Sequence, residues 1–266
     1  MSDIRIDQVE MVYQARRGTP PVVALQAISM TVADGEFACI VGPSGCGKST
    51  LLKVIAGLAR PSSGRVLVGG RPVLGPGADR GMVFQSYTLY PWLSVRRNIE
   101  FGLELRGVPR EERQRISSRL LTLMGLDGFA DAYPKALSGG MQQRVAIARA
   151  LANDPEVLLM DEPFGALDAQ TRTVMQELLT QIWEQYHKTV LFVTHDIEEA
   201  VFLGDVVYVM TARPGRIRAR IPIDLPRPRT FETMTSDAFA RYRNQILSLI
   251  HEESLKAAQL RVQEPA

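Results

Sequence analysis

The sequence has little of what marks a membrane, secreted or nucleic-acid-binding protein. Its longest apolar runs, residues 157–160 and 190–193, are far shorter than the ~18 residues of a membrane span. Residues 1–30 lack the charged start and apolar stretch of a signal peptide. Only two cysteines, Cys39 and Cys46, occur, and they form no CxxC pair. Lys plus Arg number 31 against 29 Asp plus Glu, so no basic excess favours nucleic acid. These absences predict a reduced, cytosolic protein.

The composition is that of a globular protein, with 45% hydrophobic and 23% charged residues. Apolar runs alternate with segments of helical spacing, which favours a mostly parallel sheet covered on both faces. The predicted strands are residues 37–41, 65–68, 82–84, 157–160, 190–194 and 205–210. Predicted helices are residues 49–58 and 168–187. Residues 4–29 alternate apolar and polar types around a break at 16–21, which predicts short antiparallel strands.

Two further segments interrupt this alternation. Residues 86–155 are rich in helix-forming residues, and we expect a helical subdomain inserted into an α/β core that spans 1–225. Residues 224–230 combine prolines with two arginines and predict a linker. Residues 226–266 form the tail, in which apolar positions at helical spacing predict a helix over 236–260.

A glycine-rich segment follows the strand at 37–41 and matches GxxxxGK[ST] in full. Its backbone N–H groups and the start of the following helix suit phosphate groups. Lys48 supplies a point charge to the β- and γ-phosphates, and the Ser49 hydroxyl suits Mg²⁺. The predicted nucleotide contacts of this loop are Gly42, Pro43, Ser44, Gly45, Cys46, Gly47, Lys48, Ser49 and Thr50.

Two carboxylates, Asp161 and Glu162, end the apolar strand at 157–160. In an open α/β sheet this edge is where ligands bind. Asp161 is placed to bind Mg²⁺ through water, and Glu162 to polarise an attacking water. The alternative interpretation is a strand that ends in two solvated acids. The presence of the phosphate loop favours the metal and catalytic roles over this alternative.

Residues 137–144, Leu-Ser-Gly-Gly-Met-Gln-Gln-Arg, precede a predicted helix. Ser138 suits an N-cap, and Gly139 and Gly140 leave backbone N–H groups open. Together with the phosphate loop and the acidic strand end, this segment resembles the signature of the ATP-binding cassette (ABC) transporter nucleotide-binding subunit. The resemblance covers residues 4–225. It implies an α/β fold, with a P-loop NTPase (RecA-like) core, an N-terminal antiparallel β-subdomain and an inserted α-helical subdomain.

The resemblance also assigns roles to single residues. Tyr13 resembles the aromatic residue that stacks on adenine, although an ordinary strand aromatic is the alternative. Gln85 resembles the Q-loop glutamine that contacts Mg²⁺ and the attacking water. Asp168 lies in a segment that resembles the D-loop, with Gly165 where the family usually has serine. His195 resembles the switch histidine that holds the γ-phosphate.

The signature departs from the family pattern at one position, where Met141 replaces glutamine. Methionine cannot donate the glutamine's hydrogen bond, so we assign the signature contacts to Ser138, Gly139 and Gly140. In the family, the signature of one copy completes the nucleotide site of a second copy. The resemblance therefore implies a homodimer that holds two ATP molecules with Mg²⁺; pairing with a second, different ATPase subunit is the alternative.

Two segments resemble the ATPases of importers for nitrate, sulfonates, taurine and related small anions. They are residues 90–107 and 211–217. The first would line the groove for a coupling helix of the membrane permease, with Tyr90 and Trp92 as anchors; packing inside the helical subdomain is the alternative. The arginines from Arg213 to Arg220 are interpreted as a solvated strand face.

The resemblance thus predicts an ATP-hydrolysing motor subunit, peripheral at the cytoplasmic face of the inner (plasma) membrane. It would drive separate integral-membrane permease subunits that receive solute from an external binding protein. Glu162 is the predicted general base, with Lys48, Gln85 and His195 also acting at the phosphates. The alternative is a soluble ABC-type ATPase acting on DNA or ribosomes. The chain has no long coiled-coil insertion, second cassette or basic patch to favour that alternative.

Overall fold

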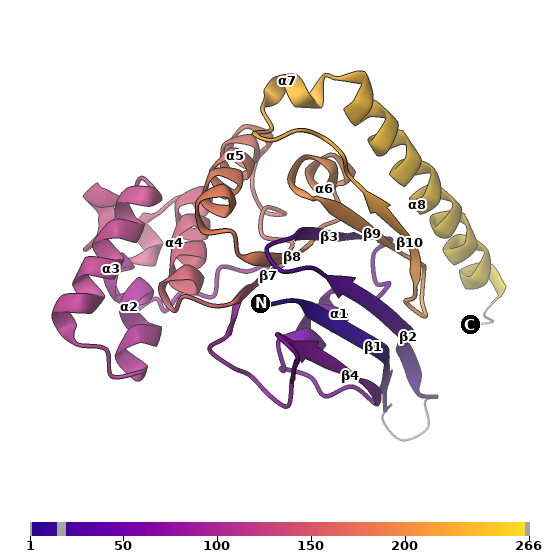
Figure 1. Cartoon of the computed structure of the whole chain (residues 1–266), viewed down its shortest axis with the longest axis horizontal. Coiled ribbons are helices and arrows are strands. Elements are labelled where there is room, and N and C mark those ends of the chain that lie inside the picture. The colour runs from indigo at the N-terminus through magenta and orange to yellow at the C-terminus, as the bar shows by residue number, and fades with distance from the viewer. Residues whose placement is uncertain (1, 15–19, 264–266) are drawn as a thin grey trace.

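Two β-sheets form the centre of the computed structural model, which describes residues 2–14 and 20–263 (Figure 1). The larger sheet has six strands in the order β10-β9-β3-β8-β7-β6. Its neighbouring strands pair in parallel, except that β10 pairs antiparallel with β9 at one edge. The strands are β3 (Phe37–Val41), β6 (Arg80–Val83), β7 (Val157–Asp161), β8 (Thr189–Val193), β9 (Val206–Met210) and β10 (Ile217–Pro222).

The smaller sheet is antiparallel, with strand order β2-β1-β4-β5. Its first two strands confirm the antiparallel pair predicted for residues 4–29. Most of the predicted break at 16–21 lies outside the described residues. The strands are β1 (Ile4–Tyr13), β2 (Val22–Val32), β4 (Ser63–Val68) and β5 (Arg71–Pro72).

Strand β3 illustrates why the larger sheet is covered on both faces. All five of its residues are buried. Their side chains alternate between two cores: Phe37, Cys39 and Val41 belong to one, and Ala38 and Ile40 to the other. A parallel strand buried on both faces is a continuous apolar run, which is the pattern that predicted it.

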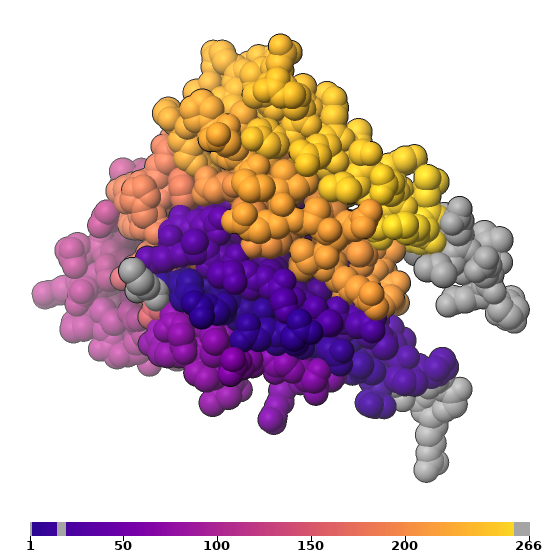
Figure 2. All heavy atoms as spheres, turned by 45° about the vertical axis from the view of Figure 1, so that its right-hand side comes forward, coloured from indigo at the N-terminus to yellow at the C-terminus, as the bar shows by residue number. Residues whose placement is uncertain are grey.

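Helices and the smaller sheet complete these two cores. The core on one face is closed by α1 and the smaller sheet, and the core on the other by α5, α6 and α8. Helix α8 lies along the side of the molecule next to β9 (Figures 1 and 2). Helix α1 ends three residues before the predicted residue 58, and Gly57 follows with a positive φ of 75°. The helices are α1 (Lys48–Ile55), α5 (Ala169–Tyr186), α6 (Ile197–Leu203), α7 (Phe231–Met234) and α8 (Asp237–Gln263).

A group of helices between β6 and β7 lies to one side of the larger sheet (Figure 1). Ser94 and Ser138 cap α2 and α4, because their hydroxyls accept hydrogen bonds from the N–H groups of Arg97 and Met141. No helix within the described ranges is long and apolar enough to cross a bilayer. The elements here are α2 (Val95–Leu105), α3 (Arg110–Leu123), α4 (Gly139–Ala152) and the 3₁₀ turns η1 (Asp127–Phe129) and η2 (Pro134–Ala136).

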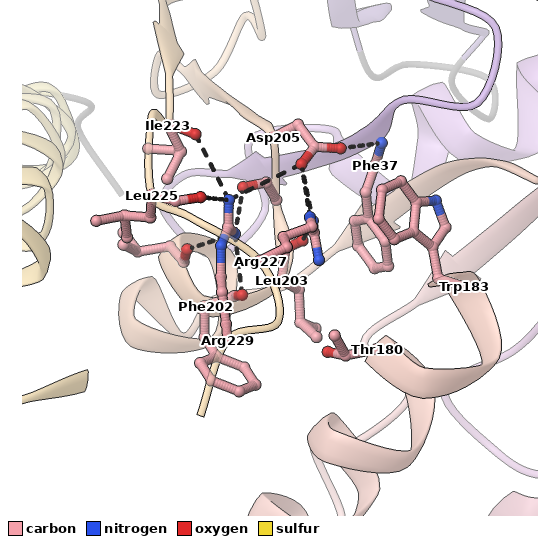
Figure 3. A network of polar contacts seen from close by, with 12 residues as sticks. Phe37, Thr180, Trp183, Phe202, Leu203, Asp205, Ile223, Leu225, Arg227 and Arg229 are labelled. Atoms are coloured by element: carbon pink, nitrogen blue, oxygen red, sulfur yellow. Dashed lines mark hydrogen bonds and ion pairs between the residues drawn. The ribbon is translucent and has the colours of Figure 1, made fainter. Parts of the chain in front are cut away.

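The segment 224–230 is not the linker that its prolines and arginines predicted. Arg229 is only 4% exposed and donates to the carbonyl oxygens of Val201, Phe202 and Gly204, at 3.1, 3.0 and 2.7 Å (Figure 3). These carbonyls end α6 and would otherwise have no intrahelical partner. Burial, reinforced by the charge of Arg227, lowers the Arg229 pKa to about 10. The segment therefore fastens the C-terminal helices to the core.

Arg227 extends this anchor on the other side of the segment. Its guanidinium donates to the Leu203 carbonyl at 2.6 Å and to Asp205 Oδ1 at 2.8 Å. It also lies 4.1 Å from the ring centroid of Trp183 on α5, close enough for a cation–π contact (Figure 3).

We predict that Arg229→Ala lowers the free energy of unfolding by about 3 kcal/mol, because it leaves several buried carbonyl oxygens unpaired. Urea unfolding of the full chain measures the change. Arg241→Ala is the matched control, since Arg241 is an exposed arginine on α8. Equal unfolding midpoints for the two variants would contradict the anchoring role.

Candidate nucleotide site

The phosphate-binding loop connects β3 to α1, as its sequence predicted. Lys48 begins α1, and its ammonium donates to the carbonyl oxygens of Gly42 at 2.8 Å and Pro43 at 3.2 Å. Gly47 has a φ of 109°, a conformation that favours glycine, and provides no side-chain cap for α1. The first N–H groups of the helix therefore stay open beside a buried positive charge, as an anion site requires.

Strand β7 brings Asp161 to the start of this helix. Asp161 is 7% exposed, and its Oδ1 accepts a hydrogen bond of 2.8 Å from the Ser49 hydroxyl. Burial raises the pKa of the Asp161 carboxyl, against the hydrogen bond from Ser49, which lowers it. A carboxylate and a hydroxyl this close form a set of hard oxygen donors, which is the donor type that Mg²⁺ prefers.

Glu162 changes the direction of the chain at the end of β7. Its φ of 44° is in the left-handed region that non-glycine residues rarely adopt. The backbone N–H of Glu162 donates to the carbonyl oxygen of Val193 on β8 at 2.8 Å, which supports this conformation. Such strain at a strand end is common where a side chain must point into a functional site.

Three polar side chains meet at the Glu162 carboxylate. Oε2 of Glu162 lies 3.0 Å from Nδ1 of His195 and 3.5 Å from Nε2 of Gln85. The three residues follow neighbouring strands of the larger sheet, β7, β8 and β6. The Glu162 side chain is 19% exposed and that of His195 is 62% exposed, so the carboxylate is sheltered while the imidazole is open to solvent.

A pocket of about 410 Å³ joins these parts. It extends over the phosphate loop to Tyr13, whose hydroxyl lies 3.5 Å from Oγ1 of Thr50. The predicted site residues that line it are Tyr13, Ser44, Gly45, Gly47, Lys48, Ser49, Thr50, Gln85, Glu162 and His195. One pocket therefore contains most of the predicted nucleotide contacts.

Several predicted contacts of the phosphate loop lie outside the pocket lining. Gly42 and Pro43 act through their carbonyl oxygens, which hold Lys48. Cys46 is 1% exposed and packs into the core beneath the loop, and this burial raises the pKa of its thiol. The backbone N–H of Cys46 donates to the Pro43 carbonyl at 3.3 Å within the loop.

The signature and D-loop residues of this chain also lie outside that pocket. Ser138, Gly139 and Gly140 form the start of α4, where the Ser138 hydroxyl caps its own helix. Asp168 is the N-cap of α5 and accepts from the Thr171 N–H at 3.0 Å. Hydrogen bonds to Thr171 hold the pKa of Asp168 below its usual value. Within a single copy these groups therefore do not line the pocket that contains the phosphate loop.

Arg213 is a pocket residue that the sequence analysis missed, because it was interpreted as part of a solvated strand face. It precedes β10 and lines the pocket, where its Nη2 donates to the Gly45 carbonyl at 3.1 Å. Strand direction could have placed Arg213 in the site. Because β9 and β3 are parallel, the residues that follow β9 reach the same edge of the sheet as the phosphate loop.

The sequence matches the ABC transporter family over residues 25–165. The nitrate import ATP-binding protein NrtD of Synechocystis sp. is 51% identical over 253 residues, 93% of this chain and 94% of that protein. The taurine import ATP-binding protein TauB of Rhizobium johnstonii is 50% identical over 262 residues, 96% of this chain and 99% of that protein. A solved dimeric ATP-binding cassette in a post-hydrolysis state, bound to ADP and Pi, has a TM-score of 0.72 and 34% identity. The match covers 100% of that structure's chain and 84% of this chain.

A phosphate loop between β3 and α1, with acids at the end of a strand in the same sheet, defines a P-loop NTPase. The comparisons make the assignment specific. The chain belongs to the ABC transporter family and is an ATP-hydrolysing, ATP-binding cassette of that family.

A second buried acid lies next to the loop that carries His195. Glu199 on α6 is 3% exposed and accepts a hydrogen bond of 3.2 Å from Nε2 of Gln176. Burial raises its pKa from 4.5 to about 7, against the hydrogen bonds that it accepts. The folded chain therefore keeps this proton over a range in which the unfolded chain releases it.

We predict a pH dependence of stability that follows from this shift. Between pH 4.5 and 7 the folded state binds more protons at Glu199, so its contribution to stability falls as the pH rises. The stability of Glu199→Gln relative to wild type should therefore increase by on the order of 3 kcal/mol across this window. Urea unfolding at a series of pH values measures the difference, and a difference that is constant with pH would contradict the prediction.

Proposed function

We propose that the chain is the motor subunit of an importer for nitrate, taurine or a similar small anion. The observation that carries the proposal is the convergence of Lys48, Glu162 and His195 on one pocket. The names of two relatives, each about half identical over nearly the whole chain, support import of this solute class. The solute itself would be selected by other polypeptides.

The assigned roles follow from the chemistry of each group. Lys48 and the open N–H groups of α1 would bind the phosphates of ATP, with Tyr13 beside the adenine. Ser49, Asp161 and Gln85 would hold Mg²⁺, whose oxygen-ligand chemistry they fit. When bound, Mg²⁺ offsets part of the negative charge of the phosphates.

Glu162 is the proposed general base. Its carboxylate accepts protons, it is partly sheltered from solvent, and the His195 and Gln85 side chains fix its position. In this arrangement, Glu162 would take a proton from the attacking water. His195 would hold the γ-phosphate from the neighbouring strand end.

A second copy would complete each site. The N-terminus of α4, with Ser138, Gly139 and Gly140, lies outside the pocket of its own chain, and helix N-termini attract anions. The dimeric cassette with bound ADP and Pi, similar to this chain, supports a paired arrangement. Each ATP would then contact the phosphate loop of one copy and the signature of the other.

A groove of about 610 Å³ between the sheet and the helical region is the proposed docking site for the permease. Tyr90 lines it, packed on Phe101 with ring centroids 4.5 Å apart and with the Arg149 guanidinium 5.5 Å from its ring centroid. Trp92 is 69% exposed beside Tyr90, with ring centroids 5.6 Å apart, although it does not line the groove. Docking there would hold the chain at the cytoplasmic face of the membrane.

We predict that Glu162→Gln lowers the ATPase rate by roughly 100-fold or more while ATP still binds, because the amide cannot accept the proton. Steady-state turnover and equilibrium titration separate the two effects. Glu177→Gln is the matched control, since Glu177 is an exposed acid on α5. Turnover of Glu162→Gln at the wild-type rate would show that another group is the base.

Growth of a strain that lacks the gene tests the transport role. We expect a defect on nitrate as the nitrogen source or on taurine as the sulfur source. Wild type and Lys53→Ala should restore growth, but Lys48→Ala should not, because only Lys48 lies at the phosphate loop. Restoration by Lys48→Ala, at equal protein levels, would contradict an ATP-driven role.

A further inference from the structure

The loop between β9 and β10, residues 211–216, forms hydrogen bonds to two other parts of the molecule. The Gly215 N–H donates to the Ala24 carbonyl at 3.0 Å, and the Gly215 carbonyl accepts from the Gln26 N–H at 2.9 Å. The Ala212 N–H donates to Oε2 of Glu253 on α8 at 3.2 Å, and Glu253 is 3% exposed. The loop therefore links the smaller sheet and the C-terminal helix at the edge of the nucleotide pocket.

Internal hydrogen bonds support the conformation of this loop. The Thr211 hydroxyl lies within hydrogen-bond distance of the carbonyl oxygens of Ala212 and Pro214, at 2.9 and 3.0 Å, and accepts from the Arg216 N–H at 3.0 Å. Gly215 lies so close to the Cys46 carbonyl that a Cβ at this position would overlap it. The loop thus packs directly against the phosphate loop and holds Arg213 in place.

Arg213 projects from this loop into the nucleotide pocket. Its hydrogen bond to the Gly45 carbonyl uses a neutral acceptor and one of the five N–H donors of a guanidinium. Phosphate oxygens accept stronger, charge-assisted hydrogen bonds from arginine than a carbonyl does. An incoming nucleotide therefore offers Arg213 a better partner within reach of the phosphate loop.

Strand order fixes the side of the phosphate loop on which Arg213 lies. Strand β3, which ends at the loop, has β8 on one side and β9 on the other. Glu162 and His195 follow β7 and β8, whereas Arg213 follows β9. Under the proposed function the γ-phosphate lies toward Glu162 and His195, so Arg213 lies toward the opposite, ribose end of the polyphosphate.

We propose that Arg213 is a further nucleotide-binding residue, which pairs with the polyphosphate of ATP or ADP at its ribose end. This inference rests on the proposed function, because it uses the orientation of ATP given there. It extends the cationic part of the site from Lys48 to a residue that lies outside the phosphate-loop motif and is supported by α8.

Arg213→Ala tests the proposal by equilibrium titration with ATP in EDTA, which prevents turnover, and with ADP. We expect both affinities to fall by a similar factor, about five- to twentyfold, because the γ-phosphate lies at the other end of the site. Affinity should also depend less on salt concentration, since one cation is lost. In turnover assays KM should rise while kcat at saturating ATP stays near wild type.

Two other variants of the loop separate binding from a structural effect. Arg213→Lys keeps the charge and should recover part of the affinity. Arg216→Ala removes a neighbouring arginine that donates to Oε1 of Gln26 at 2.7 Å and does not line the pocket, so its affinities should equal wild type. Similar melting temperatures for Arg213→Ala and Arg216→Ala would exclude unfolding as the cause.

Three outcomes would overturn the proposal: unchanged affinities in Arg213→Ala, a loss for ATP but not for ADP, or an equal loss in Arg216→Ala. Lys48→Ala, measured in the same series, distinguishes failure of this inference from failure of the proposed site. If Lys48→Ala loses binding and Arg213→Ala does not, only the role of Arg213 is wrong. If Lys48→Ala binds ATP as wild type does, the site itself is wrong.

Discussion

The parallel pairing of the central strands is the constraint on which the site depends. Because β3, β6, β7, β8 and β9 run in one direction, the segments that follow them all reach the same edge of the sheet. Those segments contain the phosphate loop, Gln85, Glu162, His195 and Arg213. Residues far apart in the sequence thus line one pocket without any long loop having to fold over it.

The charged side chains of this site form hydrogen bonds within the chain, and a bound nucleotide can replace some of these hydrogen bonds. The Lys48 ammonium and the Arg213 guanidinium both donate to carbonyl oxygens of the phosphate loop, and Asp161 accepts from Ser49. The buried charges of Lys48 and Asp161 therefore have partners, which keeps the desolvation cost low, whereas Arg213 is exposed. Phosphate oxygens are stronger acceptors than carbonyls, so binding exchanges weaker hydrogen bonds for charge-assisted ones while the backbone framework stays in place.

Local patterns in the sequence predicted much of this arrangement, since apolar runs and the spacing of the phosphate loop are short-range signals. Strands β3, β7, β8 and β9 were found because each is an apolar run. Arg229 was missed because an arginine near prolines suggests solvent, and its burial depends on the carbonyls that end α6, more than twenty residues away. Arg213 was missed because its partner on the phosphate loop is also distant in sequence. The burial of the Cys46 side chain likewise depends on tertiary packing.

The central proposal is that two copies share each nucleotide, because the signature residues at the start of α4 do not line the pocket that contains the phosphate loop of the same chain. Sedimentation velocity of Glu162→Gln tests it most directly, with and without Mg-ATP. The claim predicts a monomer without nucleotide and a dimer with ATP, and reversion to monomer with ADP. A Glu162→Gln chain that binds ATP at saturation and still sediments as a monomer would contradict it.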